Sequence, residues 1–170
     1  MRFYAQALIF AVCAHGDQKR KYSGEPYVVH PIRVAEIVKD AEIYIHRSEC
    51  IAAALLHDVL EDTPATFDQL VTCFGDTTAQ LVREISDVSK PSDGNRTKRK
   101  ALDLAHLALA SREAQTIKTA DIIDNVLSVR KHDPQFAAVY LPEKRAQLDV
   151  LTLADEKLRE QAYQIVNGHE

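Results

Sequence analysis

An apolar run that ends in four ionisable side chains constrains this chain more than any other feature. Residues 51–56 are all isoleucine, alanine or leucine, and the pairs His57-Asp58 and Glu61-Asp62 follow. In a continuous helix, residues four apart share a face, which would set Glu61 beside His57 and Asp62 beside Asp58. Burying charged groups costs several kcal/mol unless they are paired or bound to a metal. The segment therefore predicts a bound cation at the end of a buried helix.

Length and composition favour one compact domain over residues 1–170. The chain has 170 residues, 46% of them hydrophobic, which is enough for one core but too few residues for two ordinary domains. Its formal net charge of −4 argues against a general nucleic-acid or membrane-surface binder. Its three cysteines have no C-x-x-C spacing, as expected of free buried thiols in a reducing compartment.

Residues 7–14 are apolar and follow an arginine near the start, so they could be misread as a short signal peptide. Their helical spacing fits a first core helix better. No run approaches the roughly 18 apolar residues of a membrane span. A cytoplasmic location is therefore expected.

The remaining patterns predict helices throughout. Ser48 can cap a helix that runs through the His-Asp pair and stops at Thr63-Pro64. Thr66 opens a capping box, and Gly75 can end the helix that follows it. No alternating strand pattern of useful length occurs. The expected fold is an all-α, single-domain helical bundle, with helices over 2–15, 31–39, 48–62, 66–75, 76–88, 96–110, 113–131 and, at the C-terminus, 142–166.

Two further residues qualify as ligands of the predicted cation. His30 precedes Pro31, which restricts its backbone at the mouth of a helix, and Asp121 interrupts another apolar helix. Taken singly, His30 could be a capping histidine and Asp121 a buried acid paired with a lysine. With His57 and Asp58 they make two imidazoles and two carboxylates, a set that favours Mn²⁺ or Fe²⁺ over structural zinc. Mn²⁺ is the expected ion.

Four segments carry a family resemblance. Residues 15–21 (HGDQKRK), 23–31 (SGEPYVVHP), 53–63 (AALLHDVLEDT) and 118–125 (KTADIIDN) resemble, in this order, the HD-domain hydrolases of the RelA/SpoT type. The resemblance extends over about residues 1–150, and nothing like the synthetase domain of the long members follows. It implies the HD phosphohydrolase fold and a stand-alone small alarmone hydrolase, similar to the metazoan SpoT homologues.

The resemblance also implies an activity and the residues that perform it. The family removes the 3′-pyrophosphate of guanosine 3′,5′-bis(diphosphate), giving GDP, or of the pentaphosphate, giving GTP. Binuclear HD enzymes use additional histidines downstream of the His-Asp pair, and only His106 lies between Asp58 and Asp121 here, so a single ion is expected. By resemblance, the Mn²⁺ ligands are His30, His57, Asp58 and Asp121, and the catalytic acids, which orient water and transfer protons, are Glu61 and Asp62.

Two basic runs suit a substrate that carries several phosphoryl groups. Residues 19–21 and 96–100 would, on their own, be solvated surface. By resemblance the first run contacts the nucleotide, where Arg20 can stack on the guanine. Asn125 lies four residues after Asp121 and so shares its helical face, and the resemblance implies that Asn125 meets the nucleoside. The expected substrate-binding residues are Arg20, Lys21, Ser23, Asn125, Ser128, Tyr140, Arg96 and Lys98.

Two other functions use the same residues. One is a different phosphohydrolase on this scaffold, for example a phosphatase of NADPH. The other is a non-catalytic module that binds the alarmone, although the filled ligand and acidic positions count against it. Glu61 and Asp62 could, by themselves, be a solvated helix end. The expected partner is a small nucleotide, not nucleic acid or membrane, and a homodimer is compatible with the family.

Overall fold

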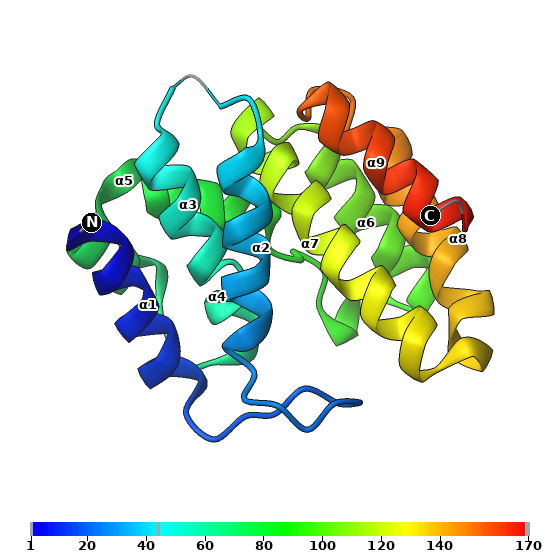
Figure 1. Ribbon diagram of the computed structural model, residues 1–170, viewed down its shortest axis with the longest axis horizontal. Coiled ribbons are helices and arrows are strands. Elements are labelled where there is room, and N and C mark those ends of the chain that lie inside the picture. The colour runs from blue at the N-terminus through cyan, green and yellow to red at the C-terminus, as the bar shows by residue number, and fades with distance from the viewer. Residues whose placement is uncertain (1, 44, 169–170) are drawn as a thin grey trace.

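The computed structural model describes residues 2–43 and 45–168, and over these ranges the chain is helical without a β-strand. The all-α prediction is therefore confirmed. Within the same ranges, none of the helices is long and apolar enough to cross a lipid bilayer. In chain order (Figure 1) the elements are α1 Arg2–His15, α2 Val29–Asp40, α3 Arg47–Leu56, α4 Val59–Asp62, α5 Phe67–Ile85, the 3-10 turn η1 Pro91–Asp93, α6 Arg96–Ala108, α7 Arg112–His132, α8 Pro134–Val150 and α9 Glu156–Asn167.

The helix α7 runs through the middle of the molecule and packs against α2, α3, α5, α8 and α9 (Figure 1). Thirteen of its 21 residues are buried. A helix that is covered on most sides is expected to be apolar on most sides. The helix α7 nevertheless buries Lys118, Asp121 and Asp124. Because buried charges need partners or a ligand, these three residues mark the part of the fold with a chemical role.

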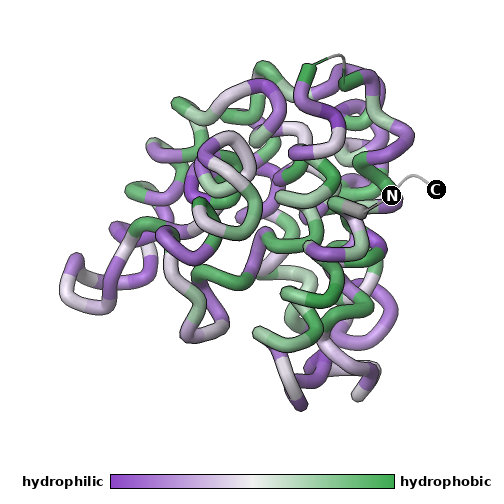
Figure 2. Tube along the Cα trace, turned by 90° about the vertical axis from the view of Figure 1, so that its left-hand side faces the viewer, coloured by the Kyte–Doolittle hydropathy of each residue, from purple (hydrophilic) through white to green (hydrophobic). Residues whose placement is uncertain are grey.

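One hydrophobic core draws buried residues from every helix between α1 and α9. Figure 2 shows hydrophobic and hydrophilic residues alternating along the trace, the pattern of amphipathic helices around a shared core. Cys50 belongs to this core, whereas Cys13 and Cys73 are exposed. The expectation of buried thiols is therefore right for Cys50 alone.

The helix predicted over 48–62 is broken at the His-Asp pair. α3 ends at Leu56 and α4 begins at Val59, so His57 and Asp58 lie between the two helices. The backbone of Asp58 opens to φ −96° and ψ −5°. The His57 ring donates from Nδ1 to the Ala54 carbonyl at 2.8 Å, which satisfies an acceptor left unpaired at the end of α3. The His57 side chain thus caps the end of α3. The helical spacing of apolar residues gives no sign of this break.

Other helix ends follow the local signals only in part. The capping box of Thr66 and Gln69 is present. Gly75 has a positive φ (81°) that favours glycine and a non-helical ψ (166°). The helical backbone is therefore interrupted inside α5 at the position where the sequence predicts one helix to end and the next to begin. Ser48 does not cap its helix, because α3 begins one residue before it, after His46 in a left-handed conformation (φ 54°).

The single C-terminal helix predicted over 142–166 is also wrong, since two helices cover this region. Pro142 lies inside α8, and α9 begins only after Asp155. The buried carboxylate of Asp155 accepts from the backbone N–H of Leu158 at 2.8 Å, as an N-cap, and from that of Glu42 at 3.0 Å. The second contact comes from the far end of the chain, so the local pattern could not show that the chain turns here.

The end of α6 offers a matched test of core packing, because Leu107 is 1% exposed and Leu109 is 88% exposed. We expect Leu107→Ala to lower the free energy of unfolding by about 3 kcal/mol, since buried methyl groups are lost and a cavity remains. Leu109→Ala should change it by less than about 0.5 kcal/mol. Urea unfolding followed by circular dichroism measures both values, and equal losses in the two variants would contradict this packing.

Candidate metal centre

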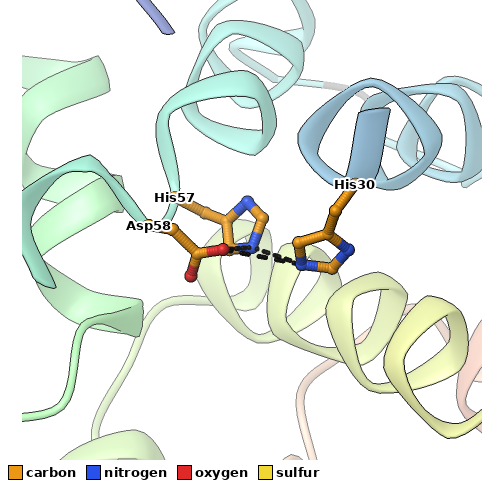
Figure 3. A group of neighbouring side chains, drawn as sticks. All are labelled: His30, His57 and Asp58. Atoms are coloured by element: carbon orange, nitrogen blue, oxygen red, sulfur yellow. Dashed lines mark hydrogen bonds and ion pairs between the residues drawn. The ribbon is translucent and has the colours of Figure 1, made fainter. Parts of the chain in front are cut away.

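Three parts of the fold bring four side chains together. His30 lies in the first turn of α2, His57 and Asp58 lie between α3 and α4, and Asp121 lies in the middle of α7. Figure 3 shows Asp58 and the ring of His57 directed toward His30, with α7 passing alongside. Side chains predicted as ligands from separate segments are therefore neighbours in the structure.

The ligand atoms of these residues converge. His30 Nε2 and His57 Nε2 lie 3.1 Å apart. Asp58 Oδ2 lies 2.9 Å from His57 Nε2 and 3.5 Å from His30 Nε2. Asp121 Oδ1 lies 3.6 Å and 3.2 Å from the same two nitrogens. One ligand atom each from His30, His57 and Asp58 lies within 4.8 Å of the others, so this group could hold a metal ion.

The outer nitrogens of both imidazoles are already used. His57 Nδ1 can only donate to the Ala54 carbonyl, so it carries the ring proton. His30 Nδ1 lies 2.7 Å from Asp124 Oδ2, which likewise favours a proton on Nδ1. A ring that binds a metal ion must be neutral, and in that form the Nε2 lone pairs of both rings would point toward each other and toward two carboxylate oxygens. Four converging acceptors repel one another unless a cation lies between them, and the donor set fits a metal ion.

The electrostatics of the centre also favour a cation. Burial alone would lower the pKa of His57, but the carboxylates of Asp58 and Asp121 raise it well above its usual value. Burial would raise the pKa of Asp121, yet the Lys118 ammonium and the two imidazoles hold it well below its usual range. The raised pKa of His57 reports the negative charge of the two carboxylates around the imidazoles, which attracts a cation. The lowered pKa of Asp121 reports the cationic and donor groups that keep this carboxyl ionised.

Residues that the sequence did not single out orient these ligands. The Tyr27 hydroxyl donates to Asp58 Oδ2 at 2.7 Å. Lys118 Nζ lies 3.0 Å from Asp121 Oδ2, so the lysine partner considered for Asp121 exists, and the other oxygen, Oδ1, faces the imidazoles. Asp124 orients His30 in a similar way, through its contact with Nδ1. The sequence does contain a signal for Asp124, because it is a second acidic residue in the apolar helix that carries Asp121. Outer contacts of this kind fix the direction and basicity of metal ligands.

The acidic pair lies in α4, beside the four ligand residues. Glu61 and Asp62 are exposed, and Glu61 Oε1 accepts from the backbone N–H of Asp87 at 3.1 Å. Desolvation by surrounding protein atoms raises the pKa of Glu61 to about 7, with further contributions from Asp58 and Asp87. Desolvation and Asp58 also raise the pKa of Asp62. A carboxyl group with a pKa near 7 can both donate and accept a proton at neutral pH.

Two of the predicted nucleotide residues connect directly to the centre. Arg20 Nη2 donates to Asn125 Oδ1 at 3.0 Å, and Asn125 Nδ2 donates to Asp121 Oδ1 at 2.5 Å. The guanidinium of Arg20 also lies 5.7 Å from the centroid of the Tyr27 ring. The loop after α1 and one face of α7 therefore meet at the ligand Asp121.

Other predicted contacts line a cavity of about 640 Å³ on the same side. Ser23 and Ser128 both face this cavity, together with Asp124. Lys21 lies nearby, with Nζ 4.8 Å from the centroid of the Tyr22 ring, which also lines the cavity.

The remaining predicted contacts fall elsewhere. Arg96 and Tyr140 line a separate cavity of about 250 Å³ between α6 and α8. Lys98 is exposed and, among the described residues, lines neither of the two cavities. His106 lies 3.2 Å from the Arg83 carbonyl and does not join the ligand cluster.

A family comparison decides where the chain belongs, because the model of the HD domain matches residues 7–143. This chain belongs to the HD domain family. The match contains all four predicted ligands and the acidic pair, and it confirms the HD-domain part of the resemblance.

Relatives of this HD domain carry a common name. A Drosophila melanogaster protein named guanosine-3′,5′-bis(diphosphate) 3′-pyrophosphohydrolase MESH1 is 36% identical over 132 residues, covering 77% of this chain and 72% of that protein. An Aquifex aeolicus protein named guanosine-3′,5′-bis(diphosphate) 3′-pyrophosphohydrolase is 40% identical over 124 residues. The chain spans only 17% of the length of the Aquifex and Synechocystis relatives.

Solved structures agree with this placement of the HD domain. A structure described as a metazoan orthologue of SpoT that hydrolyses ppGpp has a TM-score of 0.86 and 30% identity, covering 99% of this chain and 96% of that one. A Listeria monocytogenes protein with a TM-score of 0.68 is 24% identical and shows the fold alone.

The contact between Asp124 and His30 leads to a prediction about metal affinity. In metal-stripped protein, we expect Asp124→Leu to weaken Mn²⁺ binding by about 10-fold to 100-fold, because the His30 ring loses its orienting acceptor. Asp124→Asn keeps an acceptor of the same size and should lose less. Isothermal titration measures both affinities, with circular dichroism as the check on folding. Unchanged affinity in folded Asp124→Leu would exclude this orienting role.

Proposed function

We propose that this HD domain hydrolyses the 3′-pyrophosphate of guanosine 3′,5′-bis(diphosphate), giving GDP and pyrophosphate, and that of the pentaphosphate, giving GTP and pyrophosphate. The observation that carries the proposal is the match to a relative named for this activity, over 72% of that relative's length. The converging ligands and the adjacent acidic pair supply chemistry that such a reaction needs. We further propose that the protein is cytoplasmic and that its partner is a small nucleotide. That it forms a homodimer stays a prediction.

A single Mn²⁺ is the ion that the donor set favours. His30, His57, Asp58 and Asp121 would hold it, and two imidazoles with two carboxylates and no thiolate suit Mn²⁺ better than a structural zinc site. When bound, the ion would polarise water and a phosphoryl oxygen. The Tyr27 hydroxyl and the Lys118 ammonium fix the two carboxylates before the ion arrives, because each takes a carboxylate oxygen as its acceptor.

The reaction breaks the bond between phosphorus and the ribose 3′ oxygen. The oxygen of a water molecule forms a new bond to the same phosphorus, the water loses a proton, and the leaving 3′ oxygen gains one. We assign Glu61 and Asp62 jointly to orienting this water and transferring these protons. Their position in α4, with the pKa of Glu61 at about 7, supports this role because both protonation states occur near neutral pH.

The nucleoside side of the substrate falls to residues of the loop after α1 and of α7. Arg20 and Lys21 would neutralise phosphoryl charge or cover the base, and the contact from Arg20 to Asn125 supports their placement beside the ligand Asp121. Ser23 and Ser128 would line the nucleoside cavity. Tyr140, Arg96 and Lys98 lie on α6 and α8, so any contact that they make with the nucleotide would come from that side of the site.

One assay separates the candidate functions. Metal-stripped protein receives Mn²⁺, Mg²⁺ or Zn²⁺ and is incubated with the tetraphosphate, the pentaphosphate or NADPH. We expect pyrophosphate release from both guanosine nucleotides with Mn²⁺, since the donor set favours that ion. If neither guanosine nucleotide releases pyrophosphate with any ion, the proposal is wrong. Orthophosphate from NADPH alone would favour the other phosphohydrolase, and binding without turnover would favour the non-catalytic module.

Two substitutions separate the ligand role from the acidic role. Asp58→Ala should lose Mn²⁺ and activity together, because a ligand oxygen is removed. Glu61→Gln should keep Mn²⁺ but lower kcat by about 100-fold or more, because the amide cannot transfer the proton. Metal content and steady-state rates are measured on the same preparations. Glu160→Gln, an exposed change on α9, serves as the control, and full activity in Glu61→Gln would remove its assigned role.

A further inference from the structure

A second cavity lies between α6 and α8 and is rich in cations. Its volume is about 250 Å³, and its lining includes Arg96 and Lys100 from α6 and Tyr140, Glu143 and Lys144 from α8. It shares no lining residue with the larger cavity that contains Ser23 and Ser128. A site with three cations and one carboxylate in its wall attracts anions.

The cations of this cavity differ in how far they are neutralised. Arg96 forms a two-pronged contact with Glu143, at 2.9 Å and 2.7 Å. Lys100 Nζ lies 3.0 Å from Asp87 Oδ2 and 3.6 Å from the buried Asp103. Each of these two side chains therefore already has an acidic partner.

Lys144 has no such partner. Its ammonium donates to the neutral amide of Gln147 at 2.9 Å and lies 5.0 Å from the centroid of the Tyr140 ring. No carboxylate of the described residues lies within 4.0 Å of it. Burial, with Lys118 and Lys100 nearby, lowers the pKa of Lys144 to about 8. A partly buried ammonium that contacts no carboxylate is costly unless an anion binds beside it.

The cavity adjoins the catalytic side of the metal centre. Asp87, which pairs with Lys100 of the cavity, donates its backbone N–H to Glu61 Oε1. The carboxylate of Asp121 also acts electrostatically on both Lys144 and Tyr140. An anion bound beside Lys144 would therefore lie next to the reacting groups, on the α6 and α8 side.

We propose that the cavity between α6 and α8 is an anion subsite for a diphosphate group, with Lys144 as its principal cation and Lys100 and Arg96 around it. The inference rests on the proposed function for the identity of the ligand. Such a nucleotide has two diphosphate groups, the 3′ group that leaves as pyrophosphate and the 5′ group that stays on GDP. Both present the same chemistry to Lys144, and separate titrations distinguish them.

The test uses the Mn²⁺-loaded protein and direct binding. Inorganic pyrophosphate and GDP are titrated separately into wild type, Lys144→Met, Lys144→Arg and Lys157→Met. We expect Lys144→Met to weaken one of the two ligands by about 10-fold, the loss of one contact to a charged group. Lys144→Arg keeps the charge and should restore most of the affinity. Lys157→Met, on the exposed face of α9, should change neither ligand.

The two arms identify the diphosphate group. Weaker binding of pyrophosphate assigns the cavity to the leaving 3′ group, and weaker binding of GDP assigns it to the 5′ group. If Lys144→Met folds and binds both ligands as wild type does, the inference is wrong. The melting temperature of each variant checks folding, and rescue by Lys144→Arg excludes a purely structural effect.

Failure of the inference can be told from failure of the proposed function. If wild type hydrolyses neither guanosine nucleotide but Lys144→Met still weakens pyrophosphate or GDP, the function is wrong and the anion subsite stands. If wild type hydrolyses them while Lys144→Met leaves KM and both affinities unchanged, the function stands and the subsite is wrong.

Discussion

The imidazole of His30 lies between two carboxylates of one helix, and the centre depends on this arrangement. Nδ1 contacts Asp124 at 2.7 Å and Nε2 contacts Asp121 at 3.2 Å, from positions three apart on α7. The spacing sets both carboxylates on the same face of the helix. Because the ring is fully buried, it cannot meet both acids unless α2 and α7 keep one register. Packing of the core and geometry of the centre are therefore parts of the same constraint.

This arrangement concentrates charge in α7, a helix with thirteen of its 21 residues buried. Lys118, Asp121 and Asp124 are all buried in α7. Without a cation, their mutual contacts and those to the imidazoles offset the loss of hydration only in part. An ion that binds the folded chain and not the unfolded one adds its binding free energy to stability. A metal centre built in this way links folding of the domain to occupancy of its site.

The sequence was sufficient to single out the four predicted ligand residues, which the fold brings together, and insufficient for the contacts that surround them. His57, Asp58 and Asp121 stand out because charged residues interrupt apolar helices, and that signal is local. The contacts of Tyr27 and Asp124 join residues from separate segments, so no spacing rule could place them. The start of α9 depends on a contact between Asp155 and the backbone of Glu42. In the sequence, Lys144 is one lysine among many. Only the packing of α6 against α8 places it in the wall of a cavity.

The break in the chain at Asp58 has a consequence for how the reacting groups are directed. In an unbroken helix, each residue is rotated about the helix axis by a fixed angle from the one before it. The direction of the His57-Asp58 pair would then fix the direction of the Glu61-Asp62 pair. Here α3 ends before His57, and α4 is a separate helix of four residues that carries Glu61 and Asp62. The backbone at Asp58 therefore supplies a degree of freedom that a regular helix lacks. The predicted ligand pair and the predicted acidic pair can therefore point in different directions, although they lie within six consecutive residues of this chain.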